Sequence, residues 1–203
     1  SYEGTKAAAA IYCENDLTIV LNGENTVTGP DCTDEIEFSF GVYSGGDITV
    51  SGSGSLNAAG GDNGISTGVM SFDGDVTVNS GTVTARGGAG QNSVGILAAS
   101  RVIVNGGKVN AAGADDTNSF GIAAAGLTVK GGELTAKGGS FTGAADTRVS
   151  YGLALHSTTS STNSAGAMAA SANGSADVLI TGGTVTITGA TGSMDLNGGT
   201  SVI

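Results

Sequence analysis

The sequence predicts an all-β protein, a parallel β-helix (β-solenoid) that forms a single domain over residues 1–203. Glycine accounts for 37 of the 203 residues, and a short motif of an apolar residue or threonine, glycine and an aliphatic residue recurs every 26 to 31 residues. Self-similarity at 20–50 residues is typical of solenoids. The motif occurs as Phe40-Gly41-Val42, Thr67-Gly68-Val69, Val94-Gly95-Ile96, Phe120-Gly121-Ile122 and Tyr151-Gly152-Leu153.

Two further short strands are expected after each copy of the motif, because apolar residues alternate with polar or small ones there. The second strands are Ile48-Thr49-Val50, Val76-Thr77-Val78, Val102-Ile103-Val104 and Leu127-Thr128-Val129. The third strands are Leu56-Asn57-Ala58, Val83-Thr84-Ala85, Val109-Asn110-Ala111 and Leu134-Thr135-Ala136. Three strands in about 27 residues match one coil of a parallel β-helix, in which successive coils stack at roughly 4.8 Å. With an earlier copy near residues 10–29 and a later one near 178–187, we expect about seven coils.

Equivalent residues of successive coils are expected to stack inside the solenoid. The three predicted interior columns are Val42, Val69, Ile96 and Ile122; Ile48, Val76, Val102 and Leu127; and Leu56, Val83, Val109 and Leu134. Glycine suits the corners between strands, since it adopts positive φ without steric cost. No segment has the periodicity of a long helix.

Three regions interrupt the repeat. Residues 29–39 form an acidic insertion, residues 156–177 form an insertion rich in serine, threonine and alanine, and residues 190–203 are a truncated terminal coil. Insertions in solenoids project on one side and often bind ligands. A solvated spacer is the alternative for both insertions.

The charge excludes several partners. The net charge is −11 and the isoelectric point is near 4.1, which argues against nucleic acid and against anionic membrane surfaces. No apolar run is long enough to span a bilayer. The chain begins at Ser1 without an initiator Met or a signal peptide, so we expect a trimmed mature fragment.

Alternation also predicts which side chains point outward. Tyr12, Tyr43, Met70 and Leu97 each follow an interior residue, so we expect an exposed apolar stripe over four coils. Stacked aromatic rings with polar tips offer a surface for a sugar chain. A surface protein or a second copy of this chain is the other occupant that such a stripe predicts.

Three carboxylates fall at the same point of successive coils, just before the second strand. They are Asp16, Asp47 and Asp75, with Arg101 next in line. Stacked like charges repel unless they are paired or bridged, and calcium, the only cofactor that the sequence suggests, binds such oxygen clusters. The alternative is that each aspartate caps its own turn and that Asp75 pairs with Arg101.

Enzyme signatures are sparse, so we expect no catalysis. Cys13 and Cys32 form either a disulfide that closes a short loop or two small buried thiols. Neither has a neighbouring histidine or a CxxC partner, and the only histidine, His156, stands alone in the second insertion. Nucleophilic and zinc chemistry are therefore not predicted.

Several segments resemble the repeats of a known group. They are Ile11-Tyr12 with Asp16-Leu17-Thr18-Ile19, Gly41-Val42-Tyr43 with Asp47-Ile48-Thr49-Val50, and Gly81-Thr82-Val83-Thr84-Ala85-Arg86-Gly87-Gly88. The chain resembles, over nearly its whole length, the secreted or surface-attached right-handed parallel β-helix proteins of anaerobic Firmicutes. These are pectate-lyase-like solenoids, some of which bind calcium and plant polysaccharides. The resemblance implies a right-handed helix. Any ligand site that it implies lies in the first three coils, because the tyrosine position changes to Met70, Leu97, Ala123 and Ala154 and the aspartate position to Arg101, Gly126 and Asp177.

The expected function is therefore adhesion or carbohydrate binding without catalysis, outside the cell or at its surface. A polysaccharide lyase or hydrolase is the alternative, and it requires the aspartates, with Asp62 and Asp73, to converge on a cleft with Arg101 or Arg86. A third possibility is a structural spacer or a homo-oligomer that assembles through the stripe or through the open ends of the coils.

Overall fold

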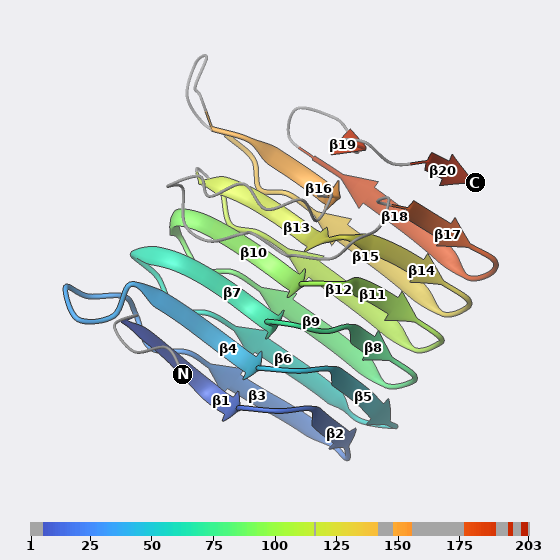
Figure 1. The fold of residues 1–203 in the computed structure, drawn as a ribbon, viewed down its shortest axis with the longest axis horizontal. Helices are drawn as coiled ribbons and strands as arrows, with labels where there is room; N and C mark the ends of the chain where they lie inside the picture. The colour runs from blue at the N-terminus through green and yellow to red at the C-terminus, as the bar shows by residue number, and fades with distance from the viewer. Residues whose placement is uncertain are drawn as a thin grey trace.

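The computed structural model describes residues 6–115, 117–141, 148–155 and 177–189, and the backbone of residues 195–196 and 200–202. This part of the chain contains twenty β-strands and no helix, and every strand pairing is parallel. The strands wind into a solenoid whose coils follow one another from the N-terminus to the C-terminus (Figure 1). No helix in the described part is long and apolar enough to cross a membrane.

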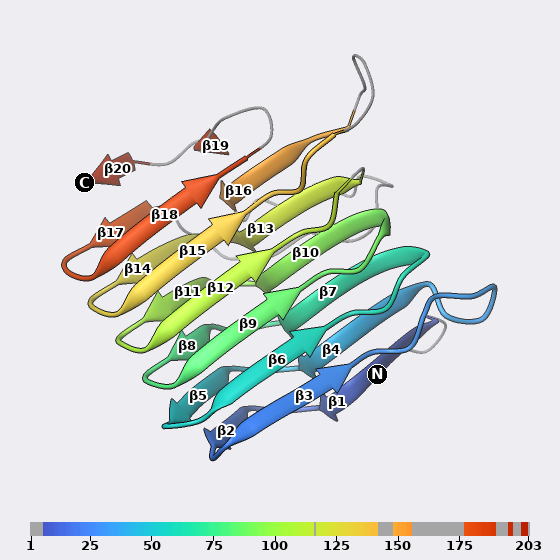
Figure 2. The same cartoon turned by 180° about the vertical axis from the view of Figure 1, so that it is seen from behind.

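Each coil contributes one strand to each of three sheets, which we call sheets A, B and C. Sheet A consists of β1 (Ala7–Cys13), β4 (Phe38–Ser44), β7 (Gly64–Ser71), β10 (Gly90–Ala98), β13 (Asn118–Ala124), β16 (Ser150–Leu155) and β19 (Asp195–Leu196). Sheet B consists of β2 (Leu17–Leu21), β5 (Ile48–Gly52), β8 (Val76–Val78), β11 (Arg101–Val104), β14 (Gly126–Val129), β17 (Asp177–Ile180) and β20 (Thr200–Val202). Sheet C, which faces the viewer in Figure 2, consists of β3 (Glu24–Thr28), β6 (Ser55–Ala59), β9 (Thr82–Arg86), β12 (Lys108–Ala112), β15 (Glu133–Lys137) and β18 (Thr184–Thr188).

The predicted number of coils was too high. The strands from β1 to β15 make five complete coils, and β16 to β20 extend the sheets beyond them. The expectation of seven counted these later strands as full coils. The insertions are also shorter than predicted, because Phe38 and Ser39 already belong to β4 and Asp177 opens β17. Residues 156–176 lie outside the described residues, as does the terminal region from 190 apart from β19 and β20.

The three predicted interior columns are confirmed. Pairing places Val42, Val69, Ile96 and Ile122 in register on sheet A, and the columns of sheets B and C align in the same way. These residues are at most 3% exposed and form one hydrophobic core. At the ends of the solenoid, Ile11 and Val185 occupy the same columns but are only half-buried.

Glycine occupies the corner between sheets B and C, as predicted. Six glycines with positive φ lie at this corner. Gly52 ends β5 of sheet B, and the other five directly precede a sheet C strand, namely Gly23, Gly81, Gly107, Gly132 and Gly183. The left-handed region is strained for residues with a side chain. The glycine of each motif has another role, because it faces the backbone of a sheet C strand and leaves no room for a Cβ atom.

The corner between sheets C and A is closed by buried serines that the sequence analysis did not single out. Ser39, Ser66, Ser93 and Ser119 align on sheet A and are completely buried. Each hydroxyl oxygen accepts a hydrogen bond of 2.6–2.8 Å from a backbone N–H at the end of the same coil. Because each buried hydroxyl has a partner, it holds the corner without a desolvation cost.

Candidate functional site

Aromatic side chains gather on the outer face of sheet A over the first three coils. The rings of Tyr12 and Tyr43 stack with centroids 5.3 Å apart and planes within 8°. Tyr43 also contacts Phe40 at 5.3 Å and Phe72 at 6.3 Å. We call these four residues the aromatic cluster. Tyr12 is 62% exposed and Phe72 is 46% exposed, so the cluster presents two rings to solvent.

The exposed apolar stripe predicted along sheet A is wrong in its exposure, although its register is right. Tyr12, Tyr43, Met70 and Leu97 align on four successive strands. Tyr43, Met70 and Leu97 are only 6–7% exposed, and they belong to a second hydrophobic cluster on the outside of the sheet. Of the four, Tyr12 alone remains open to a ligand.

The motif glycine explains the second cluster, because it faces inward next to another inward residue. Gly41 faces the backbone of Ala59 in sheet C, and the next residue, Val42, also lies in the core. Two consecutive inward positions place Phe40 and Tyr43 together on the outer face, where their rings meet. Strict alternation does not predict this contact, so the sequence analysis missed Phe40. It also missed Phe72, whose only signal is an aromatic residue directly after a strand.

The aspartate row is confirmed in its position, and its carboxylates join successive coils through hydrogen bonds. The Oδ1 atom of Asp16 accepts a hydrogen bond from the backbone N–H of Asp47 at 2.9 Å, and Asp47 accepts one from Asp75 at 2.8 Å. Asp75 in turn accepts a hydrogen bond from the backbone N–H of Arg101 at 2.9 Å. Each carboxylate therefore caps the next coil. Capping of its own turn, the alternative drawn from the sequence, is not what these hydrogen bonds show.

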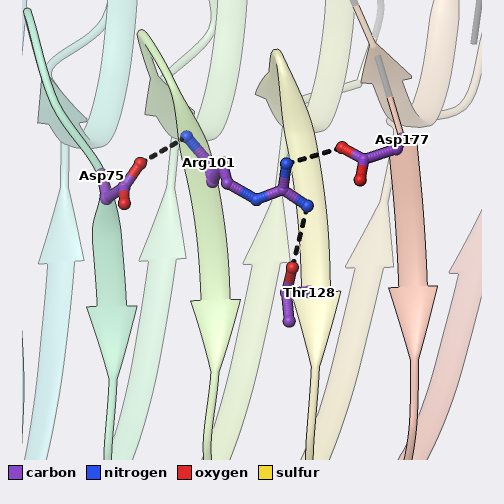
Figure 3. A network of polar contacts seen from close by, with 4 residues as sticks. All are labelled: Asp75, Arg101, Thr128 and Asp177. Carbon is purple, nitrogen blue, oxygen red and sulfur yellow. Dashed lines mark hydrogen bonds and ion pairs between the residues drawn. The ribbon is translucent and has the colours of Figure 1, made fainter. Parts of the chain in front are cut away.

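Arg101 ends the aspartate row and ties three coils together (Figure 3). Its guanidinium group does not pair with Asp75 but extends the other way, to Asp177 at 2.6 Å and to the hydroxyl of Thr128 at 2.9 Å. It passes over Gly126, where a Cβ atom would lie 2.8 Å from the guanidinium. Since both charged side chains are about one third to one half exposed, the ion pair stabilises the fold by about 1 kcal/mol or less.

The aspartate row does not fit the calcium site that the sequence suggested. One oxygen of each carboxylate is already held by a backbone N–H of the next coil. Within the described ranges, no three histidine, cysteine, aspartate or glutamate side chains gather closely enough to hold a metal ion. Calcium needs six to eight oxygen ligands, and the aspartate row gathers no such group of carboxylates in the described residues.

The residues of the enzyme alternative are likewise engaged in the fold or far from the row. Asp62 accepts a hydrogen bond from the backbone N–H of Ala89 at 2.7 Å. Arg86 ends β9 of sheet C, whereas Asp16, Asp47 and Asp75 lie just before the strands of sheet B. Of the residues that this alternative requires, Asp62 is thus held by a backbone N–H and Arg86 belongs to a different sheet from the aspartate row.

A disulfide between Cys13 and Cys32, one of the two possibilities that the sequence left open, is contradicted, because both cysteines are free and lie near opposite ends of β1. Cys13 is the last residue of β1. Cys32 donates to the carbonyl of Glu37, and the backbone N–H of Glu37 donates to the carbonyl of Lys6, the residue before β1. β1 has seven residues, so its two ends lie roughly 20 Å apart at 3.3 Å per residue. A disulfide requires Cα atoms within about 7 Å.

We expect the two thiols to differ in reactivity and in pH dependence. Burial raises the pKa of Cys32, the N–H of Ile65 lowers it, and the nearby Asp31 and Glu37 raise it further. A thiol whose pKa is raised in the folded state stabilises the fold at low pH, and this stability is lost as the pH rises above about 8.5, the unfolded pKa. The free energy of unfolding should therefore fall by at most about 1.4 kcal/mol per pH unit from this group.

The measurement is urea unfolding between pH 7 and pH 10 for the native chain, Cys32→Ala and Cys13→Ala. Cys32→Ala should flatten the pH dependence. Alkylation of the folded protein at pH 7.5 should label Cys13 first. Equal slopes for all three proteins, or faster labelling of Cys32, would contradict this account of the buried thiol.

Comparison with protein-family models, with curated protein sequences and with solved structures gave no match. What stands of the resemblance drawn from the sequence is thus the architecture, a parallel β-solenoid with three strands per coil.

Proposed function

We propose that this protein is a non-catalytic adhesion module of the cell exterior, which binds a polysaccharide through the aromatic cluster. The observation that carries the proposal is the pair of exposed rings, Tyr12 and Phe72, on either side of the buried Tyr43. Aromatic rings offer sugar C–H groups an apolar face, and tyrosine adds a polar tip. Successive coils hold the rings in place, so little conformational entropy is lost when a ligand binds.

The negative charge around the aromatic cluster favours an uncharged polysaccharide over a polyanionic one. Three exposed carboxylates lie nearby in the sequence: Glu14 and Asp16 follow β1, which contains Tyr12, and Asp73 directly follows Phe72. The chain as a whole carries a net charge of −11. A pectate-like chain of uronic acids would be repelled at this surface, which also disfavours the lyase alternative.

We test the proposal with a glycan array of plant, host and bacterial polysaccharides, with and without EDTA. Tyr12→Ala and Phe72→Ala should each weaken binding by about two- to tenfold, since one ring contact contributes roughly 0.5–1.5 kcal/mol. Tyr12→Phe keeps the ring and should retain most of the binding. Leu179→Ala removes an apolar residue on sheet B that is about as exposed as Phe72, and it should have no effect.

Binding that is unaffected by loss of either ring would remove the aromatic cluster from the site. No binding to any glycan would overturn the proposal and leave contact with a surface protein or a spacer role. EDTA should not change the binding, because the described carboxylates do not gather into a metal site.

A further inference from the structure

A concave surface lies near the N-terminal end of β1, away from Tyr12 of the aromatic cluster near the C-terminal end of that strand. A groove of about 480 Å³ opens between the loop before β4, the start of β1 and the corner before β7. Its size falls in the range of small-molecule sites, roughly 300–1,000 Å³. It is lined by Lys6, Cys32, Thr33, Asp34, Ile36, Glu37, Asn63, Gly64 and Gln91.

The loop that forms one wall is held by the residues around it. Thr33 and Ile36 pair through two backbone hydrogen bonds of 2.8 and 3.1 Å. The ammonium of Lys6 donates to the carbonyl of Asp34, and the backbone N–H of Cys32 donates to the carbonyl of Asp62 at 2.7 Å. The groove is therefore built before any ligand arrives.

The floor of the groove depends on a glycine. A Cβ atom at Gly64 would lie 2.5 Å from the sulfur of Cys32. The thiol is 7% exposed and donates to the carbonyl of Glu37 at 3.4 Å. Because its pKa is raised, Cys32 stays neutral and packs at the base of the groove.

The rim carries polar groups of the kind that bind hydroxyl groups. Asn63 and Gln91 supply exposed amides from two successive coils, and Asp34 and Glu37 supply carboxylates. Planar amides and carboxylates each hold two donor or acceptor positions in one plane. Such groups can bind neighbouring hydroxyl groups of one ring.

Other ligand classes fit this lining less well. An anion would meet two carboxylates and one ammonium that already donates to a carbonyl. A hydrophobic ligand would find one aliphatic side chain, Ile36. A metal ion would need a gathering of acidic side chains that the described part of the chain does not contain.

We propose that this groove binds one or two uncharged sugar rings, held by the amides of Asn63 and Gln91 and by the carboxylates of Asp34 and Glu37. The class of ligand rests on the proposed function, but the residues are separate from the aromatic cluster. The length of β1 separates the groove from Tyr12. The chain would then contact a polysaccharide at two independent places.

Asn63 provides an unusually clean variant. Its φ is 74°, and it is the only non-glycine residue with positive φ in the described part of the chain. Glycine adopts this conformation more readily than asparagine, so Asn63→Gly removes the amide without straining the backbone. Gln91→Ala removes the second amide, and Asn57→Ala, an exposed amide on sheet C, is the matched control.

The experiment follows the side-chain amide signals of the ¹⁵N-labelled protein by NMR during titration with cellotetraose, xylotetraose, mannotetraose and trigalacturonic acid. At least one neutral sugar should shift the Asn63 and Gln91 signals, and trigalacturonic acid should bind at least tenfold more weakly. Asn63→Gly and Gln91→Ala should each weaken that binding at least fivefold with an unchanged Tm. Asn57→Ala should bind as the native chain does.

Tyr12→Ala separates the groove from the proposed function. It should reduce binding on the glycan array yet leave the Asn63 and Gln91 shifts intact. Loss of those shifts in Tyr12→Ala would overturn the independence of the groove. Absence of shifts with every neutral sugar, equal binding of trigalacturonic acid, or native binding by both amide variants would overturn the groove itself, whatever the array shows.

Discussion

Gly95→Ala should destabilise the protein by about 3 kcal/mol or more, the largest effect that we expect from adding a single methyl group. Gly95 is the glycine of the central motif and faces the backbone of sheet C across the interior. A Cβ atom there would clash with the backbone N–H of Ala112 and would lie 2.6 Å from the carbonyl oxygen of Gly121. Both neighbours are backbone atoms of paired strands, so neither can move without opening the coil.

Gly23→Ala is the matched control, because it separates backbone strain from crowding. Gly23 has a φ of 71° and no atom within 4 Å of the added Cβ. It should cost roughly 1–2 kcal/mol, the strain of the left-handed region alone. Urea unfolding followed by far-UV circular dichroism measures both variants. A smaller loss for Gly95→Ala than for Gly23→Ala would show that the interior has room at the motif glycine.

The motif glycine shows what repetition in a sequence can and cannot reveal. Its recurrence predicted the coil length correctly, because the coils that start at β4, β7, β10, β13 and β16 share the same close approach of sheets A and C. Its physical role was not predicted, since the sequence analysis assigned glycine to corners with positive φ. Corner glycines do exist, but Gly81 and Gly107 belong to a different position of the repeat. Crowding across the interior depends on tertiary geometry that the spacing of residues does not contain.

The candidate site was predictable only in part, for a related reason. Period-two alternation predicted that Tyr12 and Tyr43 stack on the outer face, and their rings do. Alternation says which way a side chain points, but not whether another part of the molecule covers it. Tyr43, Met70 and Leu97 are therefore outward and buried at once.

The groove shows a different limit. Asn63 lies in a bend just before β7 and Gln91 lies at the start of β10; exposed amides are common on any surface, and neither residue belongs to a motif. Their proximity to Lys6 and Glu37 follows from the path of the loop before β4. The sequence analysis identified that loop as an acidic insertion between coils, but an insertion has no repeat from which its contacts can be deduced.

Ile96→Ala should destabilise the protein by about 3–4 kcal/mol, whereas Ile11→Ala should cost about 1 kcal/mol. Both residues occupy the same interior column of sheet A, but Ile96 is completely buried in a central coil and Ile11 is half-buried in the first coil. Truncation of a buried isoleucine typically costs 2–5 kcal/mol, because apolar contacts are lost and a cavity remains. At Ile11 the surroundings are open to solvent, so less apolar area is lost.

The comparison tests whether stability is distributed along the solenoid coil by coil. In a repeat protein each coil contacts only its neighbours, so a central coil loses contacts on two sides and a terminal coil on one. Urea unfolding of both variants, with circular dichroism and tyrosine fluorescence as separate probes, gives the two losses. Equal losses would mean that the column at Ile11 is covered as well as the column at Ile96.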